Sequence, residues 1–377
     1  MKGKQGLVCM GLLLVLSSCH TGKQITASGL QRKDFQTEVN GQHTDLFTLS
    51  NKQGMEVCIT NYGARVVSIL VPDRNGKRED VVCGFSTITE YMEQRQNFGS
   101  TVGRYIGRIL NARFTLDGVE YKLVPNNGKS GHISHGGNPG FADRIWKVEQ
   151  ADTHRVCLSY LSPDGENGFP GNLKVTLVYS LGEDDNALDL TYEATTDAPT
   201  VLNLSHHSFF NISGNFTKSV EDQQLWVDAD RFTPYDDKKC VTGEYLQVAG
   251  TPLDFRMPHA IGECIDADHP QLKVVNGYDH TWELNTKGDD TRPAAWVYDP
   301  ASGRKMEIFT TEPGMQIYTG NGLKGKMTGK RGIAYPFRSA VCFETMHFQD
   351  SPNQPGFPST VLRPGEVFRS HTVYKFE

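Results

Sequence analysis

Four polar stretches stand out in this chain because each lies in otherwise apolar surroundings. They cover residues 103–108, 132–137, 203–211 and 343–347, and a shorter fifth stretch covers residues 277–280. Together they supply histidine, carboxylate, arginine and amide side chains. Histidines and carboxylates can exchange protons with a bound molecule, and arginines and carboxylates form strong directional hydrogen bonds with polar ligands.

Glu344 is a candidate general base. It follows the apolar residues 340–343, and a carboxylate at the end of a buried strand is costly unless it is paired or hydrogen-bonded. Desolvation would raise its pKa toward the range that suits a general base. A buried ion pair with an arginine is the alternative interpretation of this residue.

The histidines of the polar stretches differ in what their spacing allows. His206 and His207 are adjacent, so on a strand only one of them can face a pocket, and the other would be structural. His132 and His135 would also lie on opposite faces of a strand, which argues against a shared metal ion. The two glycines after His135 are not followed by a helical pattern, so a phosphate-binding loop is not predicted.

The elements that must position these residues are predicted to be strands. Apolar and polar residues alternate over 55–60, 156–160, 175–181 and 188–192, and turn-forming clusters lie at 73–76, 163–165, 182–186 and 299–303. Long helical periodicity is nearly absent, and strands do not alternate with helices. These patterns predict an all-β protein with one domain over residues 35–377, a large twisted antiparallel β-sandwich.

The N-terminus is predicted to be a processing signal. Lys2 and Lys4 precede an apolar segment over residues 7–16, which is too short to cross a bilayer. The sequence Leu-Ser-Ser-Cys at 16–19 resembles the lipobox of bacterial lipoproteins, and an ordinary secretory signal is the alternative. We expect a signal peptide over 1–18, a lipid anchor on Cys19, a tether over 19–34, and an exported, periplasm-facing or surface lipoprotein of a bacterium.

Composition narrows the possible partners. The chain carries 38 lysines and arginines against 44 acidic residues, a formal net charge of −6, without a basic stripe that would favour nucleic acid. No second long apolar run is present, so we expect membrane contact only through the lipid. Besides Cys9 and Cys19 there are six scattered cysteines without zinc-type spacing; Cys58, Cys157 and Cys342 are predicted to be buried thiols, and disulfide pairing stays open.

In their order along the chain, the polar stretches resemble the aldose 1-epimerase (galactose mutarotase) family. The resemblance covers about residues 35–377. Its motifs are Asn-Tyr-Gly-Ala at 61–64, Val-Pro-Asp-Arg at 71–74, the stretch 80–85, Gly-Arg at 103–104, His-Gly-Gly at 135–137, Gly-Phe at 140–141, Trp146, and the stretches 164–171, 203–211, 276–280, 316–321, 343–345, 350–353 and 362–365.

The resemblance implies a sugar site in a cleft across one sheet and interconversion of the α and β anomers of free hexoses, without a cofactor or metal. By matching position, His207 would be the general acid at the ring oxygen, and Glu344 would be the general base at the anomeric hydroxyl. Four further residues would hold the sugar hydroxyls: Arg108, His135, Asp279 and Gln316. We expect a monosaccharide substrate and a monomer or weak dimer.

Three positions depart from the family pattern. Gly107 and His206 stand where asparagine is common, and Met346 stands where glutamine is common, so the preference between galactose and glucose stays open. Three alternatives to the enzyme remain: a noncatalytic sugar-binding lipoprotein, an epimerase for a phosphorylated hexose, and a glycosidase that uses Glu344 and Asp279.

Overall fold

The computed structural model describes residues 24–377, apart from the side chain of Lys129. The predicted signal peptide over 1–18 and the predicted anchor Cys19 lie outside the described residues. In the described part, no helix is long and apolar enough to cross a membrane.

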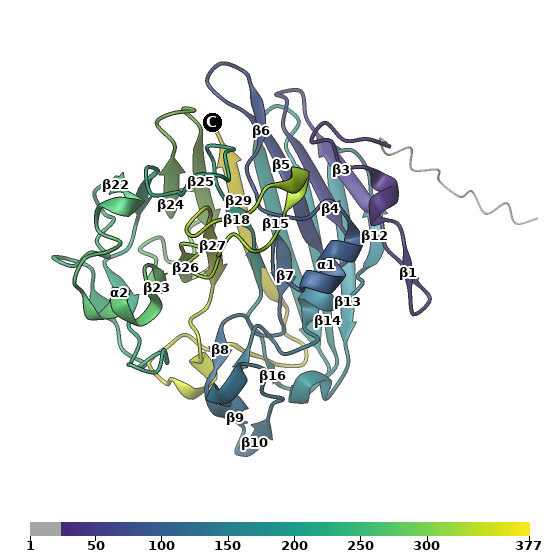
Figure 1. The fold of residues 1–377 in the computed structure, drawn as a ribbon. Helices are drawn as coiled ribbons and strands as arrows, with labels where there is room; N and C mark the ends of the chain where they lie inside the picture. The colour runs from purple at the N-terminus through teal and green to yellow at the C-terminus, as the bar shows by residue number, and fades with distance from the viewer. Residues whose placement is uncertain (1–23) are drawn as a thin grey trace, which may run out of the picture.

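One layer of the molecule is a nine-stranded antiparallel sheet (Figure 1). Its strands β13, β14 and β15 alternate between buried and more exposed residues, which confirms the alternation predicted over 156–160, 175–181 and 188–192. In spatial order the sheet contains β12 (Lys147–Ala151), β13 (Arg155–Ser162), β14 (Leu173–Leu181), β15 (Ala187–Thr196), β29 (Phe368–Phe376), β25 (Lys305–Thr310), β24 (Ala295–Tyr298), β19 (Gln224–Val227) and β22 (His259–Ala260).

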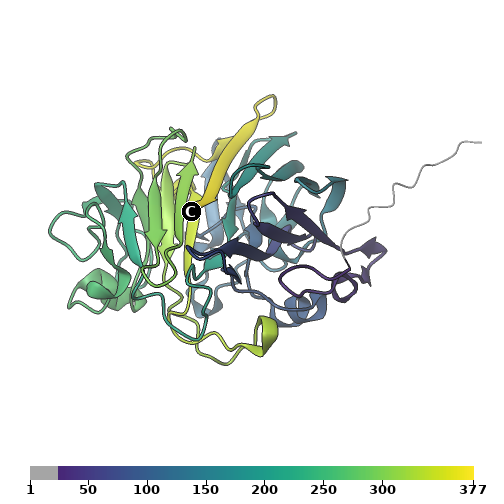
Figure 2. The ribbon, with the colours of Figure 1, turned by 90° about the horizontal axis from the view of Figure 1, so that it is seen from above.

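The facing layer consists of two smaller antiparallel sheets, which Figure 2 shows side by side. The first contains β3 (Leu46–Ser50), β4 (Glu56–Thr60), β5 (Arg65–Pro72) and β6 (Arg78–Asp80). The second contains, in spatial order, β18 (Phe209–Phe210), β27 (Val341–Met346), β26 (Gly314–Tyr318), β23 (Asp279–Glu283), β20 (Arg231–Thr233) and β21 (Leu246–Gln247). One apolar cluster joins the two layers, with Val57 and Ile317 from the small sheets and Leu177 and Ile308 from the large one. The prediction of a large antiparallel β-sandwich is therefore confirmed.

Short elements complete the fold, and two of the short strand pairs matter for the pocket described below. These are β7 (Ser100–Val102) with β17 (Ser205–His207), and β8 (Arg108–Ile109) with β11 (Ile133–Ser134). The other pairs are β1 (Glu38–Val39) with β2 (Gln42–His43), β9 (Arg113–Leu116) with β10 (Val119–Lys122), and β16 (Thr200–Val201) with β28 (Val361–Leu362). The α-helices are α1 (Ile88–Gln94), which begins with a capping box of Thr87 and Glu90, and α2 (Pro270–Val275).

The chain from residue 24 to 34 packs against the sandwich, so the tether predicted over 19–34 is too long. The backbone amides of Ala27 and Ser28 donate to Glu56 Oε1 at 2.7 and 3.2 Å, and Ser28 Oγ lies 3.0 Å from Ser68 Oγ. This segment covers the side of β4 that faces away from the main core. All five residues of β4 are therefore buried, instead of alternating as the sequence predicted.

The six cysteines of the described residues are free thiols. Cys58 and Cys342 are fully buried, as predicted. Cys157 is only partly buried, because its neighbours Val156 and Leu158 on β13 point into the core and the alternation turns Cys157 outward.

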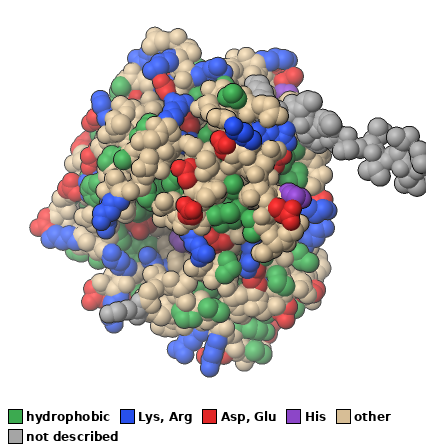
Figure 3. All heavy atoms as spheres, turned by 45° about the vertical axis from the view of Figure 1, so that its right-hand side comes forward, with side chains coloured by type: hydrophobic (Ala, Val, Ile, Leu, Met, Phe, Trp, Pro, Cys, Tyr) green, Lys and Arg blue, Asp and Glu red, His purple; other side chains and the backbone are tan. Residues whose placement is uncertain are grey.

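On the face shown in Figure 3, basic and acidic side chains are interspersed. This face therefore presents no continuous basic surface of the kind that binds nucleic acid.

Candidate active site

One face of the six-stranded sheet forms the floor of a polar pocket. Glu344 on β27 pairs with Gln316 on β26, and Asp279 at the start of β23 pairs with Tyr318 on β26. Because side chains alternate along each strand, these four residues share one face of the sheet. The opposite face carries apolar residues such as Ile317 into the main core.

The wall of the pocket comes from two short strand pairs. His207 ends β17, which pairs with β7, and Arg108 begins β8, where it pairs with Ser134 of β11. His135 follows β11 with φ at 52°, and its backbone amide donates to Gly107 O at 2.9 Å. This left-handed turn directs His135 into the pocket beside His207.

All six residues predicted to act on the sugar line this pocket, which has a volume of about 250 Å³. The two histidines, the two carboxylates, Arg108 and Gln316 thus converge from five strands and one turn. The remaining lining residues are Gln96, Asn97, Gly107, Ser134, Phe209, Tyr318, Met346 and Gln349. Such a small, mostly polar cavity suits a single polar ring.

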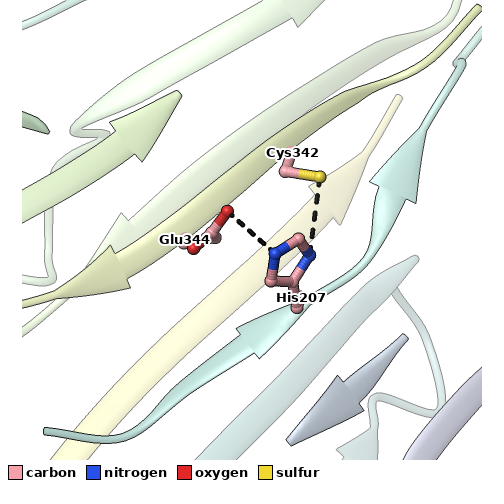
Figure 4. A group of neighbouring side chains, drawn as sticks. All are labelled: His207, Cys342 and Glu344. Atoms are coloured by element: carbon pink, nitrogen blue, oxygen red, sulfur yellow. Dashed lines mark hydrogen bonds and ion pairs between the residues drawn. The ribbon is translucent and has the colours of Figure 1, made fainter. Parts of the chain in front are cut away.

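His207 and Glu344 form a buried pair in the pocket. His207 Nε2 lies 3.3 Å from Glu344 Oε1, and both side chains are less than a tenth exposed (Figure 4). The partner of Glu344 is therefore a histidine rather than the arginine of the alternative interpretation.

Burial disfavours the charged form of both members of this pair. It raises the pKa of Glu344 well above the usual range, and the nearby carboxylate of Asp279 adds to the rise. Burial also lowers the pKa of His207 to about 4. Burial therefore favours a pair that shares one proton, with Glu344 protonated and His207 neutral, over two separated charges.

Cys342 contacts the other nitrogen of the same imidazole. Its Sγ lies 3.6 Å from His207 Nδ1, and it stands two residues before Glu344 on the same face of β27. Burial raises the pKa of the Cys342 thiol well above its usual value, so the sulfur keeps its proton. Nε2 is the nitrogen that faces Glu344, and the protonation of Nδ1 decides whether the thiol or the imidazole donates in the contact with Cys342.

The ligand atoms of His207, Cys342 and Glu344 all lie within 4.8 Å of one another, close enough for a metal ion. A metal ion held by all three groups would take a single imidazole nitrogen, however, whereas Glu344 and Cys342 contact different nitrogens of His207. The imidazole also stands between its two partners, with one nitrogen toward each (Figure 4). This arrangement fits a hydrogen-bonded relay better than a metal centre.

The remaining histidines divide as the sequence predicted. His206 points away from the pocket, with Nε2 at 2.7 Å from Ser208 Oγ. His132 accepts a hydrogen bond from the Asn111 amide at Nδ1, so it shares no ligand position with His135. His135 has a buried Nδ1 without a partner in the described part of the chain, and burial lowers its pKa to about 3. A neutral imidazole that lines the pocket can form a hydrogen bond with a ligand hydroxyl.

The amide of Gln316 orients Asp279. Gln316 Nε2 donates to Asp279 Oδ1 at 2.6 Å, and Thr281 Oγ1 donates to Gln316 Oε1. Burial raises the pKa of Asp279, while the Arg108 charge and the hydrogen bond from Gln316 lower it in part.

Sequence reasoning missed three residues of this network: Cys342, Gln349, whose Nε2 donates to Gln316 Oε1 at 3.3 Å, and Tyr235, whose hydroxyl accepts from Gln349 Nε2 at 2.6 Å. Only Cys342 left a signal, because it lies two residues from Glu344 and therefore shares its face of the strand. Tyr235 and Gln349 follow strands rather than lying within them, so no periodicity marks where they point.

An antiparallel β-sandwich that places a buried histidine–carboxylate pair among arginine, amide and carboxylate groups is suited to acid–base chemistry on a small polyhydroxy ligand. The model of the aldose 1-epimerase family matches residues 45–375 of this chain. The chain belongs to the aldose 1-epimerase family and is of the isomerase class.

Relatives and solved structures agree with this placement. The chain is 40% identical over 331 residues to the galactose mutarotase of Bos taurus, a match that covers 88% of this chain and 93% of the relative. It is 36% identical over 340 residues to the aldose 1-epimerase of Escherichia coli, covering 89% and 96%. The crystal structure of an aldose epimerase homologue from C. elegans superposes with a TM-score of 0.81 at 31% identity, covering 89% of this chain and 99% of that one. The noncatalytic alternative is not supported by these relatives.

Proposed function

We propose that this enzyme interconverts the α and β anomers of free hexoses such as galactose and glucose, with His207 as general acid and Glu344 as general base. The observation that carries the proposal is the 3.3 Å contact between the two side chains in the pocket. A sugar ring bound there can meet an acid and a base at its C1–O5 unit simultaneously.

Ring opening needs one proton to leave and one to arrive. Glu344 removes the proton of the anomeric hydroxyl, the C1 oxygen becomes a carbonyl, the bond from C1 to the ring oxygen breaks, and His207 protonates the ring oxygen. Rotation about the C1–C2 bond then presents the other face of the carbonyl. The reverse proton transfers close the ring as the opposite anomer, so that the enzyme ends as it began.

The electrostatics of the pair support this division. After ring opening, Glu344 carries the proton and His207 is neutral, which is the state that burial favours. The charged form from which the reaction starts, with the proton on His207, arises from the neutral pair by transfer of that proton across the 3.3 Å contact, and ring opening returns the pair to its neutral form.

The other predicted residues supply recognition. Arg108 and Asp279 suit hydroxyl groups that both donate and accept, and His135 adds a neutral imidazole to the lining of the pocket. Arg108 is the single lysine or arginine among the described residues that line the pocket. This favours a neutral sugar over a phosphorylated one.

Polarimetry tests the proposal directly. The purified chain is added to freshly dissolved α-D-galactose and α-D-glucose, and optical rotation is followed against buffer alone. We expect an acceleration that saturates with sugar concentration. Rates equal to the buffer rate with both sugars would contradict the proposal.

We also propose that the protein is exported and anchored to a bacterial membrane through a lipid on Cys19. The support is the sequence of residues 1–19 and the packing of the chain from residue 24 onward, which leaves only a short connection to the anchor. Mass spectrometry of the N-terminal peptide from the native membrane should show an acylated Cys19. A Cys19→Ala variant without the lipid should leave the membrane fraction, and unchanged membrane attachment would contradict the proposal. We expect a monomer or weak dimer, which light scattering can measure.

A further inference from the structure

Gln349 lies in the pocket although the reaction scheme above does not use it. The strand β27 ends at Met346, and the loop that follows returns the Gln349 side chain into the cavity, where it is 5% exposed. Both amide protons and one lone pair of its oxygen are engaged. Its Nε2 donates to Tyr235 Oη at 2.6 Å and to Gln316 Oε1 at 3.3 Å, and its Oε1 accepts from the Arg108 backbone amide at 3.3 Å.

Through these contacts Gln349 connects two parts of the predicted sugar-binding site: the backbone at Arg108, and the Gln316 amide that orients Asp279. On one side it holds the backbone at Arg108, and on the other it holds the Gln316 amide. Gln349 and Thr281 both donate to Gln316 Oε1, so the Gln316 nitrogen faces Asp279, where it donates at 2.6 Å. Asp279 Oδ1 is thereby occupied, and Oδ2 carries no hydrogen bond within residues 24–377.

The position of Gln349 depends on the glycine at 107. Gly107 has φ at 75°, and a Cβ atom there would lie 2.6 Å from Gln349 Cγ and 3.1 Å from its Cδ. Real Cβ atoms do not approach so closely, so any side chain at 107 would displace the glutamine. Residues 107 and 349 therefore act as a pair: one vacates the space that the other fills.

We propose that Gln349 is a positioning and specificity residue of the sugar site, which sets the orientation of Gln316 and Asp279 toward the sugar hydroxyls and requires glycine at 107. This inference rests on the proposed function. It concerns recognition rather than proton transfer, so it affects the affinity for the sugar and the preference among hexoses.

Substitution of Gln349 tests the role. Gln349→Met keeps the length of the side chain and removes its hydrogen bonds, and Gln349→Ala removes the side chain altogether. Loss of one or two hydrogen bonds should raise KM for galactose roughly five- to tenfold with kcat within about twofold, and should change the ratio of kcat/KM for galactose and glucose. A wild-type KM and an unchanged sugar ratio in Gln349→Met would overturn the proposal.

The dependence on glycine gives a second, independent test. Asparagine tolerates a positive φ, so Gly107→Asn introduces a Cβ with little backbone cost and should raise KM by displacing Gln349. In the double variant Gly107→Asn, Gln349→Ala the steric conflict is gone. We expect its KM to lie at or below that of the worse single variant. Additive effects of the two substitutions would overturn the pairing.

The controls separate this proposal from folding and from the proposed function. Gln247→Ala changes an exposed glutamine on β21 outside the pocket and should leave KM unchanged. Calorimetric titration with galactose measures the binding affinity that these contacts provide, independently of the catalytic rate. If the wild type fails to accelerate anomer exchange, the proposed function fails. Weaker galactose binding by Gln349→Met than by the wild type would still support the role of Gln349. Equal binding by the two proteins would overturn that role.

Discussion

Two histidines of this molecule lie between polar partners, one in the pocket and one on the outside of the nine-stranded sheet. His207 lies between Glu344 at 3.3 Å and the thiol of Cys342 at 3.6 Å. His371, on β29, lies between Asp290 at 2.7 Å and Asp189 at 3.1 Å, with about a third of its side chain exposed. Both therefore contact carboxylates, and the contacts alone do not distinguish them.

Their pKa values move in opposite directions. Burial lowers the pKa of His207 to about 4, whereas the hydrogen bonds and charges of Asp189 and Asp290 raise the pKa of His371 to about 8. A carboxylate stabilises the imidazolium ion only where it can remain charged, and burial of Glu344 raises its own pKa instead. A histidine beside a carboxyl group thus forms a neutral proton relay in the pocket and an ion pair at the surface.

Removal of either end of the relay should have the largest effect. Glu344→Gln removes the base and His207→Ala removes the acid, so each should lower kcat by roughly 10²- to 10⁴-fold while the protein stays folded. Polarimetry measures the rate, and circular dichroism checks the fold. His371→Gln is the matched control, since its histidine has carboxylate partners outside the pocket and should retain the wild-type rate. Wild-type turnover in either relay variant would remove that residue from the mechanism.

The pH dependence of kcat/KM should reveal the altered pKa values. The proton transfers require that the pair of His207 and Glu344 carries one proton. It does so at pH values above the lowered pKa of His207, about 4, and below the raised pKa of Glu344. Activity should therefore fall as pH drops through about 4 and should persist above about 6.5, the ordinary pKa of histidine. Polarimetric kcat/KM from about pH 3 to about pH 8 measures this acid limb. If activity already declines near pH 6.5 as the pH is lowered, burial does not set the pKa of His207.

The sequence predicted the residues of the pocket better than it predicted their neighbours. Residues such as Glu344 and Asp279 lie on strands whose alternation fixes which face they share, and the family motifs marked them individually. Gln349 and Tyr235 lie beyond strand ends, where the path of the loop decides the direction of a side chain. No local pattern carries that information.

The sequence also did not predict that both faces of a strand would be buried. The sequence over 55–60 alternates like β14, yet β4 is buried throughout because residues 24–34 cover its second face. Those covering residues are mostly polar, apart from Ile25 and the buried Leu30, and were predicted to be a tether. Their hydrogen bonds to Glu56 and Ser68 become evident only when the strand and the segment are seen together.

The Cys342 contact should have a moderate effect on the relay. Cys342→Ala removes the group that contacts His207 Nδ1, so the neutral ring can place its proton on either nitrogen. We expect kcat to fall about fivefold, corresponding to one hydrogen bond of about 1 kcal/mol, with KM unchanged. Cys83→Ala is the matched control, because Cys83 is a buried thiol of the same apolar cluster. Equal losses in the two variants would indicate a packing effect instead of a specific contact.

The surface histidine should affect stability and leave catalysis unchanged. The pKa of His371 is raised to about 8, above the ordinary value of about 6.5 for the unfolded chain. Its contribution is therefore fully present below about pH 6.5 and is lost as pH rises through about 8. Because the site is partly exposed and solvent screens it, we expect His371→Gln to lower the free energy of unfolding by only about 1 kcal/mol at pH 6.

Urea denaturation at pH 6 and pH 9 measures this contribution. The difference between wild type and His371→Gln should shrink toward zero at pH 9, where the native imidazole is neutral. His43→Gln is the control, since the His43 side chain is 78% exposed and contacts a single carboxylate at 3.7 Å. A stability loss of equal size at both pH values would mean that His371 acts through packing. The opposition between the charged surface histidine and the neutral pocket histidine would then no longer hold.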